Sequence, residues 1–417
     1  STLRSTSAAR APRSERCPIG VATTYNVPTS PMPDSSSVIR FVMPVRRNVL
    51  TALVGAVLGA VPALSALAQP ETSAIGPESR GTASKERQTV GKGPIGVALL
   101  VPPDNGIYRR AAQALIAGVR AAHAREGDKV SLEIIEIDED AAMLRALYDE
   151  LKQRGFSLVI GPLTRSAVSL VVAGGPPPVF TLALNQPESG GVPANMVTFG
   201  LSIETEARQA ASIAWDEASV ASASRRVRAA IVQDASALGR RAASAFAERW
   251  RDLGGDVYEP VTIATVTTGR VRSAVARLKA DVFFVAASPA VASALRIALG
   301  ARATIYGTSM LNTGAVLGAA PGTAAALIRS PDLDGVRLVD MPWQVQPDSV
   351  AVMAYPKPAD LHMELQKLYA LGIDAFRLAL QLLEGGTEVD LDGVTGRLRL
   401  TVRDGGAVDR AGVLAEY

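Results

Sequence analysis

The chain has 417 residues, of which 48% are hydrophobic and 20% charged, a composition typical of a globular protein with room for two or three domains. Aromatic side chains make up only 5% of the chain, which argues against an aromatic platform for nucleic-acid bases. Residues 1–68 hold seven basic and two acidic side chains, so without them the formal charge moves from +3 to −2. Because no basic excess remains, we expect no nucleic-acid partner.

The N-terminal region has the pattern of an export signal. Residues 1–42 are rich in Ser, Pro and Arg, and we interpret them as an upstream extension outside the mature protein. Residues 43–68 then combine the basic pair Arg46-Arg47, an apolar run of about 13 residues and a small-residue cleavage site ending at Ala68. The run is shorter than the roughly 20 residues that a membrane-spanning helix needs. We therefore expect a signal peptide that is cleaved near Ala68 and a periplasmic protein.

The cysteine count limits the available chemistry. Cys17 is the only cysteine in the sequence, and it precedes the predicted cleavage site. We therefore expect neither disulfides nor thiol catalysis in the mature chain. Gln69, not a cysteine, follows the cleavage site, so we expect no acyl anchor, and an association with the outer membrane is in doubt. Residues 69–93 lack apolar periodicity and are predicted to form a disordered linker, with order beginning at Pro94.

Strand and helix patterns alternate from Pro94 onwards. In residues 94–204 we expect helices at 109–126, at 141–154 and, shorter, after 161, with strands at 95–101, 130–137, 156–160, 179–184 and 196–200. Residues 205–335 repeat the pattern, and their first helix is predicted to begin at residue 204. Helices are expected at 204–217, 238–253, 270–279 and 290–299, and strands at 227–232, 257–264, 281–286 and 304–307. Residues 336–417 add a strand at 336–342, a helix at 361–383 and a terminal strand region, enough to complete two lobes.

This alternation predicts an α/β protein. Strands that alternate with helices of 10–15 residues indicate parallel sheets covered on both faces, and the continuous apolar strands agree. Two such runs meet near residues 200–205. We therefore predict two doubly wound parallel-sheet lobes joined by a hinge that the chain crosses several times.

Candidate site residues lie in the loops at the carboxyl ends of the strands, where open parallel sheets bind ligands. These loops are polar and carry little charge, as expected for a cleft that holds a polar ligand or a peptide, although connecting loops in any α/β protein can look similar. The side chains singled out as ligand or cleft candidates are Tyr108, Thr164, Ser166, Asn185, Gln186, Asp234, Ser288 and Tyr306. Asn185 and Gln186 have two interpretations: they satisfy backbone groups at the hinge, or they contact a ligand or partner directly.

Catalytic signatures are missing from the sequence. The two histidines, His123 and His362, fall in predicted helical runs, and no hydrolase, nucleotide-binding or metal-ligand motif is present. The carboxylates between Glu133 and Asp140 are interpreted as a solvated strand edge and a helix cap. We therefore expect no enzymatic activity, no cofactor and no metal site.

Five segments resemble one known family. They are TLALNQPE (181–188), FGLSIETEARQAA (199–211), DGVRLVDMPW (334–343), LYALGIDAFRLA (368–379) and GVTGRLRL (393–400). In this order and spacing they resemble the LppC family of penicillin-binding protein activators, over roughly residues 94–417. The resemblance implies the type I periplasmic-binding-protein fold and a non-catalytic role in stimulating a peptidoglycan synthase, a class A penicillin-binding protein. The alternative is a soluble periplasmic solute-binding protein that closes on an amino acid or a cell-wall fragment.

Overall fold

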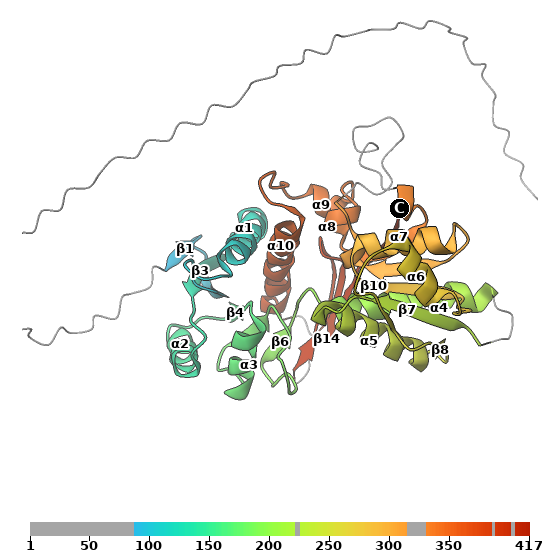
Figure 1. Ribbon diagram of the computed structural model, residues 1–417. Helices are drawn as coiled ribbons and strands as arrows, with labels where there is room; N and C mark the ends of the chain where they lie inside the picture. The colour runs from blue at the N-terminus through green and yellow to red at the C-terminus, as the bar shows by residue number, and fades with distance from the viewer. Residues whose placement is uncertain (1–86, 222–225, 315–330, 386–387, 402–404) are drawn as a thin grey trace, which may run out of the picture. The chain divides into compact units, whose positions relative to one another are not determined.

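The computed structural model describes residues 87–221, 226–314, 331–385, 388–401 and 405–417 (Figure 1). These residues belong to one compact unit, Arg80–Tyr417. The predicted upstream extension and signal peptide lie outside the described residues.

The first lobe is built on a seven-stranded sheet in the order β1-β3-β2-β4-β5-β6-β15. Its pairs are parallel except that β1 runs antiparallel to β3. The strands are β1 (Gln88–Val90), β2 (Ile95–Val101), β3 (Val130–Glu136), β4 (Leu158–Ile160), β5 (Phe180–Ala183), β6 (Met196–Thr198) and β15 (Gly406–Ala407).

Helices cover both faces of this sheet. Alternate residues of β2 point to opposite sides, so that Val97 and Leu99 join one core cluster while Ala98 and Leu100 join another. Helices α1 (Arg109–Glu126) and α10 (Met363–Leu383) lie side by side over the first cluster (Figure 1). Helices α2 (Ala141–Gln153) and α3 (Arg165–Ala173) cover the second. The apolar, non-alternating strand composition thus follows from burial on both faces.

The second lobe repeats this plan in a sheet ordered β17-β12-β11-β10-β7-β8, with β9 also paired to β7. Its strands are β7 (Arg228–Gln233), β8 (Asp256–Val257), β9 (Val261–Thr262), β10 (Val282–Ala286), β11 (Ile305–Thr308), β12 (Val336–Asp340) and the antiparallel edge strand β17 (Val413–Glu416). Helices α4 (Ile203–Ala221) and α5 (Ala237–Asp252) share one core cluster with it, and α6 (Thr268–Val275) and α7 (Pro289–Leu299) share the other.

The chain passes between the two sheets three times. It passes from the first sheet to the second lobe after β6, where α4 begins, and passes back to the first lobe after β12. Strand β15 then joins the first sheet, and the chain finally returns to the second sheet at β17. After β12, the short helices α8 (Pro342–Val345) and α9 (Val350–Met353) lead to α10 and pack on the first-lobe core. A three-stranded sheet precedes the last passage: β13 (Glu388–Asp392), β14 (Arg397–Thr401) and β16 (Asp409–Ala411). The predicted two-lobe α/β architecture with several crossings is confirmed.

Two details differ from the sequence-based expectation. Residues 88–90, predicted to be part of a linker, form β1, because a three-residue strand can pair with the β3 edge without an apolar pattern of its own. The strand predicted at 257–264 is two short strands, β8 and β9, which are separated by Pro260. Proline has no backbone N–H for a sheet ladder and therefore interrupts the strand. None of the helices formed by the described residues is long and apolar enough to cross a membrane.

Candidate functional site

Two candidate residues meet at the carboxyl edge of the first sheet. Tyr108 and Thr164 line a cavity of about 200 Å³ between the loops that follow β2, β3 and β4. Thr164 also caps helix α3 by accepting a hydrogen bond from the backbone N–H of Ala167. The hydroxyls of Thr164 and Ser166 both donate to Glu139 Oε1, each at 2.6 Å. A ligand that needed these two hydroxyls as donors would have to compete with the Glu139 carboxylate.

The NQPE segment after β5 is held against its own lobe. The Asn185 amide donates to the carbonyl of Leu163 at 3.1 Å, and its oxygen accepts from the Gln186 backbone N–H at 3.0 Å. Nearby, the Glu188 N–H donates to the Ser169 hydroxyl of α3 at 2.9 Å. Asn185 therefore satisfies backbone groups, and both of its contacts are to first-lobe residues. Whether Asn185 and Gln186 also set the hinge stays a prediction.

The three second-lobe candidates do not form one site. Asp234 follows β7 and accepts a hydrogen bond from the Ser236 N–H at 2.9 Å, a local turn contact just before α5. Ser288 is the exposed N-cap residue of α7, without a side-chain capping bond. Tyr306 is fully buried in strand β11, and its assignment to the cleft is wrong. Tyr306 lies inside β11 (Ile305–Thr308), and the loop at the carboxyl end of this strand begins only after Thr308.

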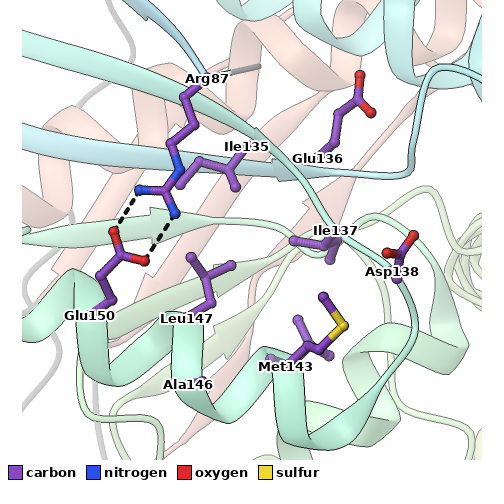
Figure 2. Close-up of a pocket in the computed structure, with 10 residues that line it drawn as sticks. Arg87, Ile135, Glu136, Ile137, Asp138, Met143, Ala146, Leu147 and Glu150 are labelled. Atoms are coloured by element: carbon purple, nitrogen blue, oxygen red, sulfur yellow. Dashed lines mark hydrogen bonds and ion pairs between the residues drawn. The ribbon is translucent and has the colours of Figure 1, made fainter. Parts of the chain in front are cut away.

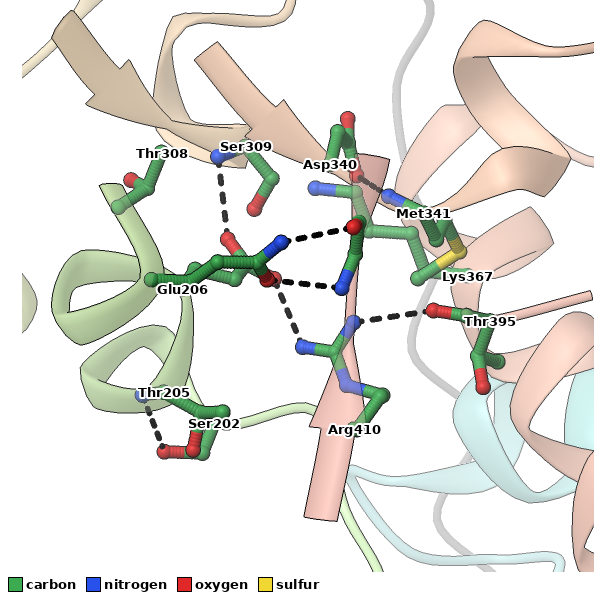
Figure 3. A network of polar contacts seen from close by, with 12 residues as sticks. Ser202, Thr205, Glu206, Thr308, Ser309, Asp340, Met341, Lys367, Thr395 and Arg410 are labelled. Atoms are coloured by element: carbon green, nitrogen blue, oxygen red, sulfur yellow. Dashed lines mark hydrogen bonds and ion pairs between the residues drawn. The ribbon is translucent and has the colours of Figure 1, made fainter. Parts of the chain in front are cut away.

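A buried ion pair at the lobe crossing was missed from the sequence. Glu206 on α4 accepts from Arg410 on β16 at 3.0 Å, and both side chains are almost fully buried (Figure 3). Arg410 also donates to the carbonyl of Thr395 at 3.2 Å, and Glu206 accepts from the Ser309 N–H at 3.1 Å. Glu206 falls on the apolar stripe of α4 beside Ala207 and Ala210, and a carboxylate in such a stripe is a signal of a buried partner.

A second buried carboxylate lies where the chain leaves β12. Asp340 accepts from the Asn312 amide and from the Met341 N–H, both at 2.7 Å. Burial raises the pKa of Asp340 to about 6, the negative charge of Glu206 adds to the rise, and the charge of Lys367 opposes it. Asp340 and Glu206 are thus close enough to influence each other, and Arg410 balances only part of their combined charge.

The network continues into the first-lobe helix α10. Asp374 accepts from the Thr395 N–H at 2.7 Å, from the Thr395 hydroxyl at 2.6 Å and from the Val394 N–H at 3.0 Å. Burial raises the pKa of Asp374, while its bonds from Thr395 work in the opposite direction. Thr395 therefore joins Arg410 and Asp374, and the contacts run from α4 through β16 to α10. The Nε of Arg410 has no hydrogen-bond partner among the described residues, but the other contacts of this buried network favour one relative position of the elements that they connect.

A reciprocal amide pair reinforces the same crossing. Gln209 of α4 donates to the carbonyl of Gly412 and accepts from its N–H, both at 2.8 Å. No group of three or more His, Cys, Asp or Glu side chains within the described part of the chain is placed to hold a metal ion. The lobe crossing is thus a polar, buried junction. The carboxyl edge of the first sheet, where Tyr108 and Thr164 line a cavity, is the more open of these two regions.

Two doubly wound lobes, three chain crossings and a buried junction define a protein of the type I periplasmic-binding class. The chain belongs to the LppC family, whose profile, described as "LppC putative lipoprotein", matches residues 92–417. The family resemblance seen in the sequence is therefore confirmed.

Relatives and solved structures agree on the fold. Penicillin-binding protein activator LpoA of Edwardsiella piscicida is 28% identical over 280 residues, which are 58% of this chain and 39% of the relative. A "putative branched-chain amino acid ABC transporter" from Chromobacterium violaceum is 31% identical, with a TM-score of 0.63 over 78% of this chain and 100% of that one. The LpoA C-domain of Haemophilus influenzae, titled a regulator of PBP1A, is 22% identical, with a TM-score of 0.59 over 77% and 97%. The chain spans less than half of the Edwardsiella relative.

Proposed function

We propose that this protein is a non-catalytic periplasmic regulator that binds and stimulates a peptidoglycan synthase of the class A penicillin-binding type. One observation carries the proposal: the LppC profile matches residues 92–417, and the curated relatives of this region are named penicillin-binding protein activators. An inference of function from the fold alone would be weak, because proteins with this architecture have many different activities. The family match is more specific than the fold.

The geometry of the junction supports a regulator that acts through its surface. The Glu206–Arg410 pair ties the second-lobe helix α4 to strand β16, and Thr395 connects that strand to α10 of the first lobe. A receptor that closes on a ligand by hinge motion needs residues at the hinge that can change conformation. A buried ion-pair network resists such motion, since breaking it would leave unpaired charges in a low-dielectric interior.

The test is a binding and stimulation assay. Purified mature protein is passed over the immobilised periplasmic regions of the class A synthases from the same cell. One synthase should be retained, and its rate of glycan polymerisation or peptide cross-linking should rise when the protein is added. Retention of none of them, with unchanged rates, would refute the proposal.

A solute-binding role is the second candidate, and one observation favours it. The 31% identity to the Chromobacterium structure, which is titled an amino acid transporter, covers all of that chain, and the first-lobe cavity lies where such proteins could bind a small ligand. A ligand that binds only the folded protein raises its melting temperature. A thermal-shift screen of amino acids and muropeptides therefore tests this role, and a flat screen would count against it.

A further inference from the structure

The first lobe exposes a set of apolar side chains beside two cavities. Ile107 is 92% exposed, Met143 57% and Tyr108 47%. Leu147 lies one turn after Met143 on α2, partly buried. Together with Ile137, which is buried but lines both cavities, these residues form what we call the Met143 surface. Large apolar groups that stay exposed on one face mark an interaction site more often than isolated ones do.

The two cavities share Ile137 and Asp138 in their linings, and we call them together the depression. The larger, of about 450 Å³, lies between helix α2 and the end of β3, where Met143 and Leu147 are turned toward Ile135 and Ile137 (Figure 2). The smaller, of about 200 Å³, has Ile107 and Tyr108 at its edge. Ile137 lines both. The far end of the larger cavity is fixed by Arg87, which donates two hydrogen bonds to Glu150, at 2.5 and 2.9 Å.

The rim of the depression is acidic. Asp138 lines both cavities, Glu139 lines the smaller, and Asp140 follows at the N-cap of α2; all three are exposed. The Glu136 side chain points to the opposite face of the sheet, away from Met143 (Figure 2). Among the residues that the structure describes, neither Glu139 nor Asp140 forms an ion pair with a basic side chain. Their field attracts cationic groups and accelerates association with a basic partner. An apolar floor with an acidic rim therefore complements a segment that carries apolar side chains next to Lys or Arg.

We propose that the Met143 surface is the docking site for such a basic and apolar segment of the partner synthase. This proposal rests on the proposed function. Apolar side chains of the segment fill the two cavities, and its Lys or Arg side chains lie against Asp138 and Glu139. Central apolar contacts supply most of the affinity of an interface, whereas rim charges mainly set the association rate.

The experiment compares exposed apolar-to-acidic changes on and off this surface. Met143→Glu and Ile107→Asp place new charges in the docking site, while Val220→Glu is the matched control at an 85% exposed position on α4 of the second lobe. Binding of the mature protein to the synthase periplasmic region is measured by biolayer interferometry, with circular dichroism as the folding check. The on-site variants should each raise Kd at least about tenfold, and the control should change it less than about twofold.

Charge reversal gives an independent readout. Asp138→Lys should slow association and reduce the dependence of the association rate on salt, with a smaller effect on dissociation. If the synthase binds and all on-site variants keep the wild-type Kd, the docking proposal is overturned while the proposed function stands. If Met143→Glu instead converts a dimer of this chain to a monomer in sedimentation, the surface joins two copies, and the proposal is also overturned.

A peptide probe separates failure of the surface from failure of the proposed function. If no synthase binds the wild-type protein, the proposed function is refuted, and fluorescein-labelled peptides with alternating Leu and Lys or alternating Leu and Glu are titrated instead. If the wild-type protein binds the Lys peptide and Met143→Glu abolishes this binding, the surface is supported as the docking site of another basic partner. No binding of the Lys peptide, or equal binding of both peptides, overturns it.

Discussion

Replacing Arg410 by methionine perturbs the buried junction at its centre. Side-chain exposure is 2% for Arg410 and 5% for Glu206, so neither charge is solvated. Removing one partner from a buried ion pair costs about 3–5 kcal/mol, because the other charge is left uncompensated. Here Glu206 keeps its hydrogen bond from the Ser309 N–H, which places the expected loss near the lower end, at about 3 kcal/mol.

The loss should depend on pH. Without Arg410, Glu206 and Asp340 repel each other, and only the charge of Lys367 acts against this repulsion at Asp340. Asp340, whose pKa is raised to about 6, is largely protonated at about pH 5 and charged at about pH 8. The destabilisation by Arg410→Met should therefore be larger at the higher pH.

Urea unfolding, followed by tryptophan fluorescence and by circular dichroism, measures this loss in the free energy of unfolding. Trp250 reports on the second-lobe core, Trp343 reports on the first-lobe core, and circular dichroism follows both lobes. The double variant Glu206→Gln/Arg410→Met removes both charges and should recover more than half of the loss. A single variant within about 0.5 kcal/mol of wild type, or a double variant whose loss equals the sum of the single losses, would refute the reasoning.

Three further predictions concern other parts of the fold. The folded-state pKa of Asp340 lies near 6 and its ordinary value near 3.8. The free energy of unfolding of wild type, relative to that of Asp340→Asn, should therefore be greatest at acid pH and fall by up to about 3 kcal/mol between about pH 4 and 6. Urea unfolding of both proteins at a series of pH values measures this difference. Asn185→Ala with Gln186→Ala should lower the melting temperature and leave synthase binding intact; weaker binding with unchanged stability would contradict this. Gly118→Ala should destabilise the protein by about 2 kcal/mol or more, because the added Cβ would lie 1.9 Å from a backbone oxygen of α10. Its control, Gly269→Ala in α6, meets no atom within 4 Å and should be neutral or stabilising in the same denaturation assay.

The large elements were predictable from the sequence because their signals are local. The helix predicted over 109–126 and the strand over 95–101 agree with α1 and β2, since each shows an unbroken apolar pattern with polar or glycine ends. Strand β1 carries no such signal. Its three residues are ordered by pairing with β3, which is a tertiary contact.

The candidate site was predictable only in part. Loops at the carboxyl ends of strands directed attention to Tyr108 and Thr164, which do share a cavity. The Glu206–Arg410 pair joins residues that are 204 positions apart, and nothing in the sequence around Arg410 specifies that partner. Tyr306 was misplaced because it lies inside the strand, predicted at 304–307 and found at Ile305–Thr308, so its side chain packs in the core and not in the loop that follows.

The most direct test of the central claim is the rate of a class A synthase with and without this protein. The periplasmic region of the synthase that the protein retains is incubated with a lipid-linked glycan precursor and increasing amounts of mature protein. The account predicts that the polymerisation or cross-linking rate rises and saturates with added protein, and that the protein alone consumes no precursor. A rate that stays flat across concentrations where the two proteins form a complex would contradict the account.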